Sequence, residues 1–399
     1  MLLTITDANG NAVSDITSLA YKTVRDGKGA SISGYDITNK SGVITLFNNK
    51  EITASPTKTD EWNITVTLVN YDKDQSNNAG KNFTAKLMIQ KEKIKETVAT
   101  VCSNGQTLSS CIISMDGKDD TLYHHTSSLT NGAGDNSYRY AGASDQVNNF
   151  VCFGSTQTPC PTDNLYRIIG VIDGKVKLIK YDYATSALLG TNGDYYGTST
   201  PNTSYYKGSL TSIDKYSWNN VTKKNTWSES NLNKINLNTN FINNIGSTWA
   251  NKIATTTWKV GGNTFDNIGS SVPSIAYQNE IVSPSENTTS DAKIGLMYAS
   301  DYGFAASPSA WTTTLYNYDG NDAKGTSIKT INWMYMGYDD WMISRNSAYS
   351  ISALLVYYRG RVNYTVVSNS YGVRPSFNLS SSITYVSGSG SAVDPILIN

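Results

Sequence analysis

Residues 332–379 read NWMYMGYDDWMISRNSAYSISALLVYYRGRVNYTVVSNSYGVRPSFNL, and this stretch decides how the fold is interpreted. It holds seven of the 27 tyrosines and two of the eight tryptophans, interleaved with arginine, asparagine, serine and aspartate. Large amphipathic rings beside adaptable hydrogen-bonding side chains are typical of protein binding surfaces. The stretch therefore predicts recognition of another molecule rather than catalysis.

A β-hairpin is predicted inside this stretch. Ile351–Tyr358 and Val362–Val367 are rich in β-branched and aromatic residues, and Gly360 between them supplies the flexible position that a reversal needs. Successive side chains of a strand face opposite sides, so Tyr357 and Tyr358 point in opposite directions. The pattern leaves open which of the two faces solvent, and whether these tyrosines are ligand contacts or ordinary cross-strand pairs.

The order of residues toward the C-terminus resembles a known fold. Trp341-x-x-Ser344, a variable polar and aromatic segment, and then Ser370–Pro375 (SYGVRP) are similar to the C-terminal half of the C-type-lectin-like fold. That fold is shared by formylglycine-generating-enzyme-type domains and by the variable proteins that diversity-generating retroelements mutate. Those proteins end in W-x-S and G-F/V-R motifs, with mutable positions between them; here one extra residue separates Trp341 from Ser344, and Val373 stands where Phe is common.

The chain also resembles a group of uncharacterised surface proteins of Gram-positive, often gut-dwelling, bacteria. The matching residues are Asp163–Val171 (DNLYRIIGV), Ile294–Tyr298 (IGLMY) and the YGVRP end, and the resemblance covers roughly Asp135–Asn399. It implies a scaffold that displays a ligand-binding surface, with no activity assigned to most members.

This resemblance and the tyrosine-rich composition together give a predicted contact face and its supporting frame. The expected contact residues are Tyr338, Asp339, Asp340, Arg345, Asn346, Tyr349, Tyr357, Tyr358, Arg359, Arg361, Asn363, Asn369 and Tyr371. The expected frame residues are Trp341, Ser344, Gly372 and Arg374, of which Arg374 is expected to be hydrogen-bonded inside the domain.

Composition and charge narrow the classes of partner. The 399 residues carry no net charge, and only 16% are charged, so the chain lacks the basic excess that a nucleic-acid partner requires. No apolar run approaches the roughly 20 residues that span a bilayer. The first ten residues, MLLTITDANG, lack the basic and apolar regions of a signal peptide. We expect an extracellular, cell-surface protein whose export and cell-wall or membrane attachment depend on a segment absent from this chain.

Cysteine spacing supports an oxidising compartment. The four cysteines form two local pairs, Cys102 with Cys111 and Cys152 with Cys160. Zinc ligands usually come as C-x2-4-C pairs, and neither spacing fits that pattern. We therefore expect two disulfides, ahead of free thiols or a metal site, and no cofactor.

The expected fold class is β-rich with two domains, an N-terminal immunoglobulin-like β-sandwich followed by an α+β C-type-lectin-like domain. Residues 1–95 form the predicted sandwich, 96–130 a connector with a helix and a disulfide, and 131–399 the lectin-like domain. The strands expected in the sandwich are Leu2–Thr6, Val43–Phe47, Trp62–Val69 and Phe83–Gln90. Residues 7–15 are interpreted as an Asx-rich turn rather than a calcium loop.

Several further elements are predicted along the chain. A helix should begin near Lys91 and end at Asn104-Gly105, and a hairpin should turn at Asp173-Gly174. Helices are expected within Trp227–Ile253, a buried strand and then a short helix within Lys293–Ser309, and a final strand at Ile396–Ile398.

The remaining aromatic and titratable residues are given mainly structural interpretations. Four tryptophans, Trp218, Trp227, Trp258 and Trp311, are expected to be buried anchors, and His124 and His125 exposed loop residues. Tyr195, Tyr196, Tyr205 and Tyr206 make a second candidate surface. Asp301 is the one carboxylate of its segment that could do chemistry, but no second acid or base accompanies it at helical spacing.

Two function classes remain after an enzyme is set aside. Formylglycine-type oxidation uses cysteines in the C-terminal half, and this chain has none after Cys160; it also has no histidine after His125. We expect an adhesin-like binding protein, not an enzyme, whose partner is an unknown protein or glycan on a host or bacterial surface. The alternative is a structural pilin or filament subunit, a homo-oligomer whose aromatic surface packs against a neighbour.

Overall fold

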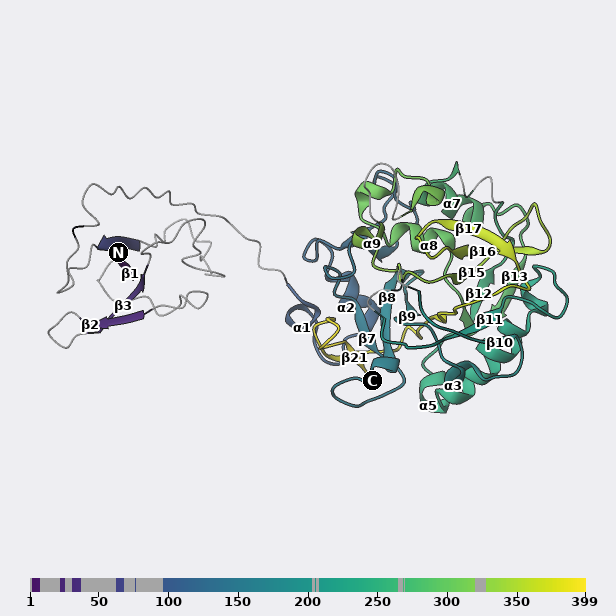
Figure 1. The fold of residues 1–399 in the computed structure, drawn as a ribbon, viewed down its shortest axis with the longest axis horizontal. Helices are drawn as coiled ribbons and strands as arrows, with labels where there is room; N and C mark the ends of the chain where they lie inside the picture. Colours follow the sequence, from purple (N-terminus) through teal and green to yellow (C-terminus); the bar gives the residue numbers. More distant parts are fainter. Residues whose placement is uncertain are drawn as a thin grey trace. The chain divides into compact units, whose positions relative to one another are not determined.

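The computed structural model describes most of the last three-quarters of the chain and four strands of the first quarter. The described residues are 2–7, 22–25, 31–36, 62–67, 76 and 96–399, apart from 203, 204, 206, 207, 265–267, 269, 320–327 and the side chain of residue 329. The chain divides into two compact units, Met1–Ile94 and Lys95–Asn399 (Figure 1).

The described part of the first unit is an antiparallel sheet with strand order β2-β3-β1-β4. Its strands are β1 (Leu2–Asp7), β2 (Lys22–Arg25), β3 (Ser31–Asp36) and β4 (Trp62–Thr67). The strands predicted at the start of the chain and around Trp62 are confirmed. The strands predicted at 43–47 and 83–90, and the Asx-rich turn after residue 7, lie outside the described residues.

A seven-stranded antiparallel sheet organises the second unit. Its order is β14-β19-β9-β8-β6-β5, and β7 pairs with β8 beside this path. The strands are β5 (Leu122–His124), β6 (Tyr138–Tyr140), β7 (Phe150–Cys152), β8 (Leu165–Ile172), β9 (Lys175–Lys180), β14 (Ile294–Gly295) and β19 (Ser376–Asn378). The chain is therefore β-rich with several antiparallel sheets.

The hairpin β8–β9 lies at the centre of this sheet. Its turn is Asp173-Gly174, with φ of 49° and 70°, so both residues take the left-handed conformation that a two-residue turn requires. The predicted hairpin is confirmed. Nearly every side chain of the two strands is buried, including the charged residues Arg167, Lys177 and Lys180.

Smaller sheets surround the central one. Two of them have three strands: β10-β11-β18, formed by β10 (Tyr195–Ser199), β11 (Ile213–Ser217) and β18 (Ser370–Tyr371), and β15-β16-β17, formed by β15 (Asp340–Arg345), β16 (Ser352–Val356) and β17 (Val362–Val366). Two have two strands: β12 (Thr256–Lys259) with β13 (Thr289–Ala292), and β20 (Tyr385–Ser387) with β21 (Leu397–Ile398). The predicted final strand is confirmed as β21.

The α-helices of the described residues are short. They are α1 (Val98–Val101), α2 (Leu108–Ile113), α3 (Ser186–Leu189), α4 (Ile242–Asn244), α5 (Ser247–Ala250), α7 (Pro273–Tyr277), α8 (Ala299–Phe304) and α9 (Ile328–Ile331). Figure 1 shows α7 and α9 at one end of the second unit and α3 and α5 at the other. The predicted strand followed by a short helix at 293–309 is confirmed as β14 and α8.

Two helix predictions need correction. The described part of the helix expected from Lys91 is only α1, which ends at Val101, and α2 follows the turn at Gly105 (φ 86°). Within Trp227–Ile253 the main element is a ten-residue π-helix, Leu232–Phe241, rather than α-helix. Its asparagine amides donate to other segments, as Asn236 Nδ2 does to the carbonyl oxygen of Leu189 (2.8 Å).

The core of the second unit is one large apolar cluster that includes side chains from α2, β8, β9, β16 and β19. The four tryptophans expected to be anchors, Trp218, Trp227, Trp258 and Trp311, are all at most 1% exposed, so that prediction is confirmed. Burying such large rings supplies much of the hydrophobic stabilisation of the domain.

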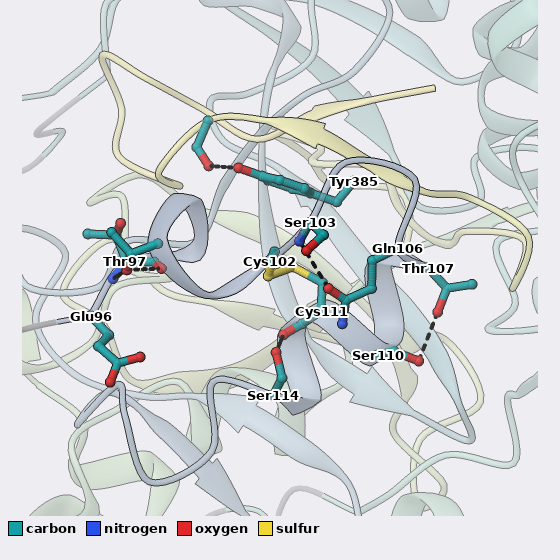
Figure 2. The surroundings of a disulfide bond; sticks show 12 residues. Glu96, Thr97, Cys102, Ser103, Gln106, Thr107, Ser110, Cys111, Ser114 and Tyr385 are labelled. Atoms are coloured by element: carbon teal, nitrogen blue, oxygen red, sulfur yellow. Dashed lines mark hydrogen bonds between the residues drawn. A yellow bond between two sulfur atoms is a disulfide. The ribbon is translucent and has the colours of Figure 1, made fainter.

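Both predicted disulfides are present, Cys102–Cys111 and Cys152–Cys160. The first closes the loop between α1 and α2 and lies near Tyr385 (Figure 2). The loop also pairs with the C-terminal segment, because Gly105 N donates to the Tyr385 carbonyl (2.9 Å) and Tyr385 N donates to the Gln106 carbonyl (2.8 Å). Residues 96–130, expected to form a connector, thus lie within the second unit.

Candidate functional site

The predicted hairpin at the C-terminal end of the domain is present as β16 and β17. Antiparallel pairing ends at Val356 and Val362, so five residues, 357–361, form the loop. Tyr357 N donates to the Arg361 carbonyl (2.8 Å), and Gly360 N donates back to the Tyr357 carbonyl (2.6 Å). Gly360 has φ of 104°, which explains why glycine occupies this position.

Two tyrosines and two arginines of this loop contact one another, and we call them the tip cluster: Tyr357, Tyr358, Arg359 and Arg361, with Tyr316 from the neighbouring segment. The Arg361 guanidinium lies 4.8 Å from the Tyr357 ring centre and 5.1 Å from that of Tyr316. Arg359 lies 5.5 Å from the ring centre of Tyr358, and the two loop tyrosines are 4.4 Å apart. Cation–π contacts of this kind hold long arginine side chains in place.

The loop is fixed from below by side chains of other elements. Tyr358 N donates to Asp339 Oδ1 (2.7 Å), and the Tyr335 hydroxyl donates to the Tyr358 carbonyl. The Tyr302 hydroxyl donates to the Gly360 carbonyl (2.7 Å). Because these bonds anchor the backbone of the loop, the tip cluster is held in a defined conformation before any ligand arrives.

Asp339 is the titratable group beneath the tip cluster. It is half-buried, and this burial raises the pKa of its carboxyl group to about 6. The bond from Tyr358 N favours the ionised form and opposes part of this rise. The charge beneath the loop therefore changes in a mildly acidic pH range.

Three of the predicted contact residues are buried and do not reach the surface. Tyr338 packs edge-on against Tyr183 (5.7 Å between ring centres) in a small apolar cluster. Asp340 accepts from Arg374 Nε (2.6 Å). Asn346 is fully buried and accepts backbone N–H bonds within its own turn. These three side chains stabilise the fold, and the prediction that they belong to the contact face is wrong.

The other predicted contact residues are spread over several places. Arg345 is tied to the Gly261 carbonyl (2.9 Å) and to Glu286. Tyr349 is 53% exposed and stacks on Tyr364, with ring centres 5.6 Å apart, at the end of the hairpin opposite to the loop.

Two asparagines and one tyrosine complete the predicted set. Asn363 lies on β17 and accepts from Tyr364 N (2.9 Å), and Asn369 donates to Thr365 Oγ1 (2.7 Å). Tyr371 is half-buried and lies edge-on to Trp341 at 5.0 Å. The structure therefore brings only Asp339, Tyr357, Tyr358, Arg359 and Arg361 together at the loop.

The four expected frame residues are all buried beneath or beside β15. Trp341 Nε1 donates to the Tyr216 carbonyl (2.8 Å), and the Ser344 hydroxyl donates to Glu280. Arg374 pairs with Asp340 and also donates to the Met334 carbonyl (2.8 Å). At Gly372, a Cβ atom would lie 2.5 Å from the ring of Tyr183, so a larger residue would displace that ring.

Asp301 has partners that the sequence did not reveal. Lys177 Nζ donates to its Oδ2 (2.5 Å) and Arg139 Nη1 to its Oδ1 (3.2 Å). Arg139 also pairs with Asp135 (2.8 Å). The partners lie 124 and 162 residues away along the chain, so no local spacing could have indicated them. Lys177 and Arg139 are buried, whereas Asp135 is half-buried.

The two histidines differ from the sequence prediction. His125 is fully buried, not exposed, between Phe304 and Trp311, and its Nδ1 accepts from Ala133 N (3.0 Å). Burial lowers the pKa of His125 to about 3, so the ring is neutral at physiological pH. His124 is half-buried at the end of β5 and stacks on Tyr138 at 4.1 Å. The prediction was wrong because other elements of the domain pack over both histidines at the end of β5.

The second candidate surface does not form one patch. Tyr196 is 66% exposed, whereas Tyr195 packs edge-on against Tyr216 (5.4 Å). The Tyr205 hydroxyl donates to Asp182 (2.7 Å), and residue 206 lies outside the described residues. Only Tyr196 of the described three tyrosines is available for a partner.

Among the described residues, no three His, Cys, Asp or Glu side chains gather into a group that could hold a metal ion. No helix in the same part of the chain is long and apolar enough to cross a membrane. Comparison of the chain with protein families, with curated proteins and with solved structures finds no match.

Proposed function

We propose that this chain is a bacterial cell-surface binding protein of the adhesin type and that the tip cluster is its contact surface for a protein or glycan ligand. The observation that carries the proposal is the anchored loop, in which two tyrosines and two arginines stand on a backbone fixed by Asp339, Tyr335 and Tyr302. Rigid aromatic and arginine side chains lose little entropy on binding, and they dominate measured interface energies.

We propose a different role for each of the two units. Residues 95–399 act as a C-type-lectin-like head, and residues 1–94 as an immunoglobulin-like spacer. The buried Trp341 and Arg374 beneath the loop support the first assignment, and the antiparallel sheet of β1–β4 supports the second. The two disulfides are compatible with an extracellular location.

Ligand binding by Tyr357→Ala plus Tyr358→Ala, compared with the unmodified protein on a glycan and protein array, tests the proposal. We expect at least a tenfold loss of affinity, because removing central aromatic anchors costs about 2 kcal/mol or more each. Tyr196→Ala is the matched control, since it removes an exposed tyrosine far from the loop in sequence. Equal binding by the double variant and the unmodified protein would show that the tip cluster is not the contact surface.

We also propose that a retroelement diversifies the head, and burial indicates which positions would tolerate such variation. Exposed positions such as Tyr349, Arg359 and Asn369 can change without disturbing the core, whereas Asp340 and Asn346 cannot. Sequencing the same locus across isolates tests this part. We expect changes at adenine-containing codons of the exposed positions; scattered or absent variation would remove the retroelement from the proposal.

The alternative function, a filament subunit, rests on a different feature. Tyr349, Ile351 and Val366 are exposed at the end of the hairpin opposite to the loop, and β17 ends its sheet among the described residues. An open edge beside apolar side chains favours pairing with a second copy. Size-exclusion chromatography and electron microscopy separate the two functions: filaments favour assembly, and monomers favour the adhesin.

A further inference from the structure

A buried lysine and a buried aspartate meet in the core of the second unit. Lys177 lies on β9 in the central sheet, and Asp301 lies on α8. Lys177 Nζ is 2.5 Å from Asp301 Oδ2, and the two side chains are only 5% and 3% exposed. We call these residues the Lys177–Asp301 pair.

The surroundings of the pair are apolar and buried, which makes the charged form of the amine less favourable than in water. Lys177 Nζ lies 4.6 Å from the ring centre of Tyr298 and 5.4 Å from that of Trp258. Burial in this aromatic setting lowers the pKa of Lys177, and the nearby Asp301 opposes that change. A lysine becomes a nucleophile when it loses its proton, which is why desolvated lysines are common in covalent catalysis.

Both oxygens of the Asp301 carboxyl group are fixed by hydrogen bonds. Oδ1 accepts from Arg139 Nη1 (3.2 Å), and Oδ2 accepts from Tyr298 N (3.0 Å) as well as from Lys177. A cationic donor at Oδ1 stabilises the negative charge that forms on that oxygen when the carbonyl carbon is attacked. The donor and the nucleophile thus contact different oxygens of the same carboxyl group.

We propose that Lys177 and Asp301 condense to an amide that links β9 covalently to α8. A proton passes from the Lys177 ammonium to Oδ2, and the Nζ lone pair then attacks Cγ to form the N–C bond. Arg139 stabilises the charge on Oδ1 in the tetrahedral intermediate. The Cγ–Oδ2 bond breaks, and Oδ2 leaves as water with a second proton from Nζ. Ammonium plus carboxylate give amide plus water, so no oxidant, reductant or other reactant is needed.

The loss of two buried charges favours the amide over the ion pair. Keeping an ion away from water costs several kcal/mol, and condensation removes both charges of the pair. Arg139 remains neutralised by Asp135, which it contacts at 2.8 Å, so the reaction leaves no unpaired arginine behind. The fixed contact also replaces a bimolecular encounter with an intramolecular one of very high effective concentration.

The intact mass of the full chain tests this proposal directly. With the two disulfides reduced, we expect a mass lower than that of the sequence by one water molecule. Trypsin should then fail to cleave after Lys177, and tandem mass spectrometry should find one branched peptide joining residues 176–180 to residues 294–324.

Lys177→Arg is the matched control, because it keeps a positive charge beside Asp301 but has no nucleophilic amine; its mass should show no loss of water. The unmodified protein decides the question even if this variant folds poorly. A full mass with normal cleavage after Lys177 would show that the pair is only ionic. A water loss that maps to any other residue would also overturn the proposal.

Discussion

Two adjacent carboxylates, Asp339 and Asp340, show how strongly local surroundings decide the use of a residue. Asp339 is half-buried and holds the N–H of Tyr358, whereas Asp340 is buried and neutralises Arg374. Asp340 is the first residue of β15 and lies in the core, whereas Asp339 precedes the strand and contacts the hairpin loop.

Asp339 should make both stability and binding depend on pH. Its pKa in the folded protein, about 6, lies above the ordinary value of 3.8, so the folded state binds the proton more tightly. Its contribution to stability is therefore present below about pH 4 and is lost as the pH rises through about 6. Asp339→Asn keeps an acceptor for Tyr358 N but cannot ionise.

Between pH 4 and pH 7 we expect the unfolding free energy of the variant to fall by about 2 kcal/mol less than that of the unmodified protein. Urea unfolding at several pH values, with the change in unfolding free energy compared between the two proteins, measures the effect. Identical slopes would show that Asp339 titrates normally in the folded state.

Arg374 should be among the least replaceable residues. Arg374→Met would leave the Asp340 carboxylate buried without a cation, and breaking one side of a buried ion pair costs about 3–5 kcal/mol. Replacing both residues, Arg374→Met with Asp340→Leu, removes the uncompensated charge. Thermal unfolding should show the double variant to be clearly more stable than the single one; additive losses would contradict a direct pairing.

At this scale the sequence predicted residue types better than residue environments. Composition indicated that Tyr357, Tyr358 and Arg361 belong to a recognition surface, but nothing in the local pattern separated them from Asn346, which is buried. The partners of Asp301 are more than 120 residues away along the chain, and that pairing depends on the whole sheet.

The hairpin β16–β17 shows which elements a sequence can specify locally. Its strands follow from β-branched runs and its loop from Gly360, as the turn of β8–β9 follows from Asp173-Gly174. The π-helix at 232–241 was not predicted, because apolar periodicity does not distinguish its wider turn from an α-helix; its asparagine amides bond to residues more than 40 positions away along the chain. Elements held by local geometry were predictable, and elements held by distant contacts were not.

Gly360→Ala should disturb the loop more than the equivalent change in the central hairpin. A Cβ at residue 360 would overlap Ile328 and approach the Tyr318 carbonyl at 2.8 Å, and the φ of 104° is itself unfavourable for alanine. We expect a loss of about 2–3 kcal/mol and weaker ligand binding.

Gly174→Ala is the control, because its φ of 70° is also positive but a Cβ there meets nothing within 4 Å. That change should cost only about 1 kcal/mol and leave binding unaffected. Chemical denaturation and the binding array measure both effects. Equal losses in the two variants would mean that the packing around residue 360 has no influence on the loop.

For the molecule as a whole, the sequence indicated β-rich architecture and both disulfides, because these follow from composition and from short spacings. Which strands become neighbours did not follow, since β9 pairs with residues 376–378 and the loop at 105–108 pairs with residues 383–385. Such pairings depend on loop closure over hundreds of residues, which no local pattern records.

The two disulfides should differ in their effect although they close loops of similar length. Chain entropy alone gives each about 2–3 kcal/mol. The loop of Cys102–Cys111 forms three backbone bonds with Tyr385 and Ile383, whereas the loop of Cys152–Cys160 forms one with the C-terminal segment, from Cys152 N to the Ile396 carbonyl. Release of the first loop should therefore loosen the C-terminal segment more. We expect the Cys102→Ser plus Cys111→Ser variant to melt at a lower temperature than the Cys152→Ser plus Cys160→Ser variant, as measured by calorimetry; the reverse order would argue against this coupling.

The order in which strands enter the central sheet has a consequence for biosynthesis. β9 is made early, yet one of its two neighbours, β19, comes from residues 376–378, and β7 receives a bridge from Ile396. A nascent chain consequently keeps an open β-edge until its last few dozen residues have been synthesised, which makes folding slow and late. Until then the unpaired edge can associate with other chains, so the incomplete polypeptide is prone to aggregation.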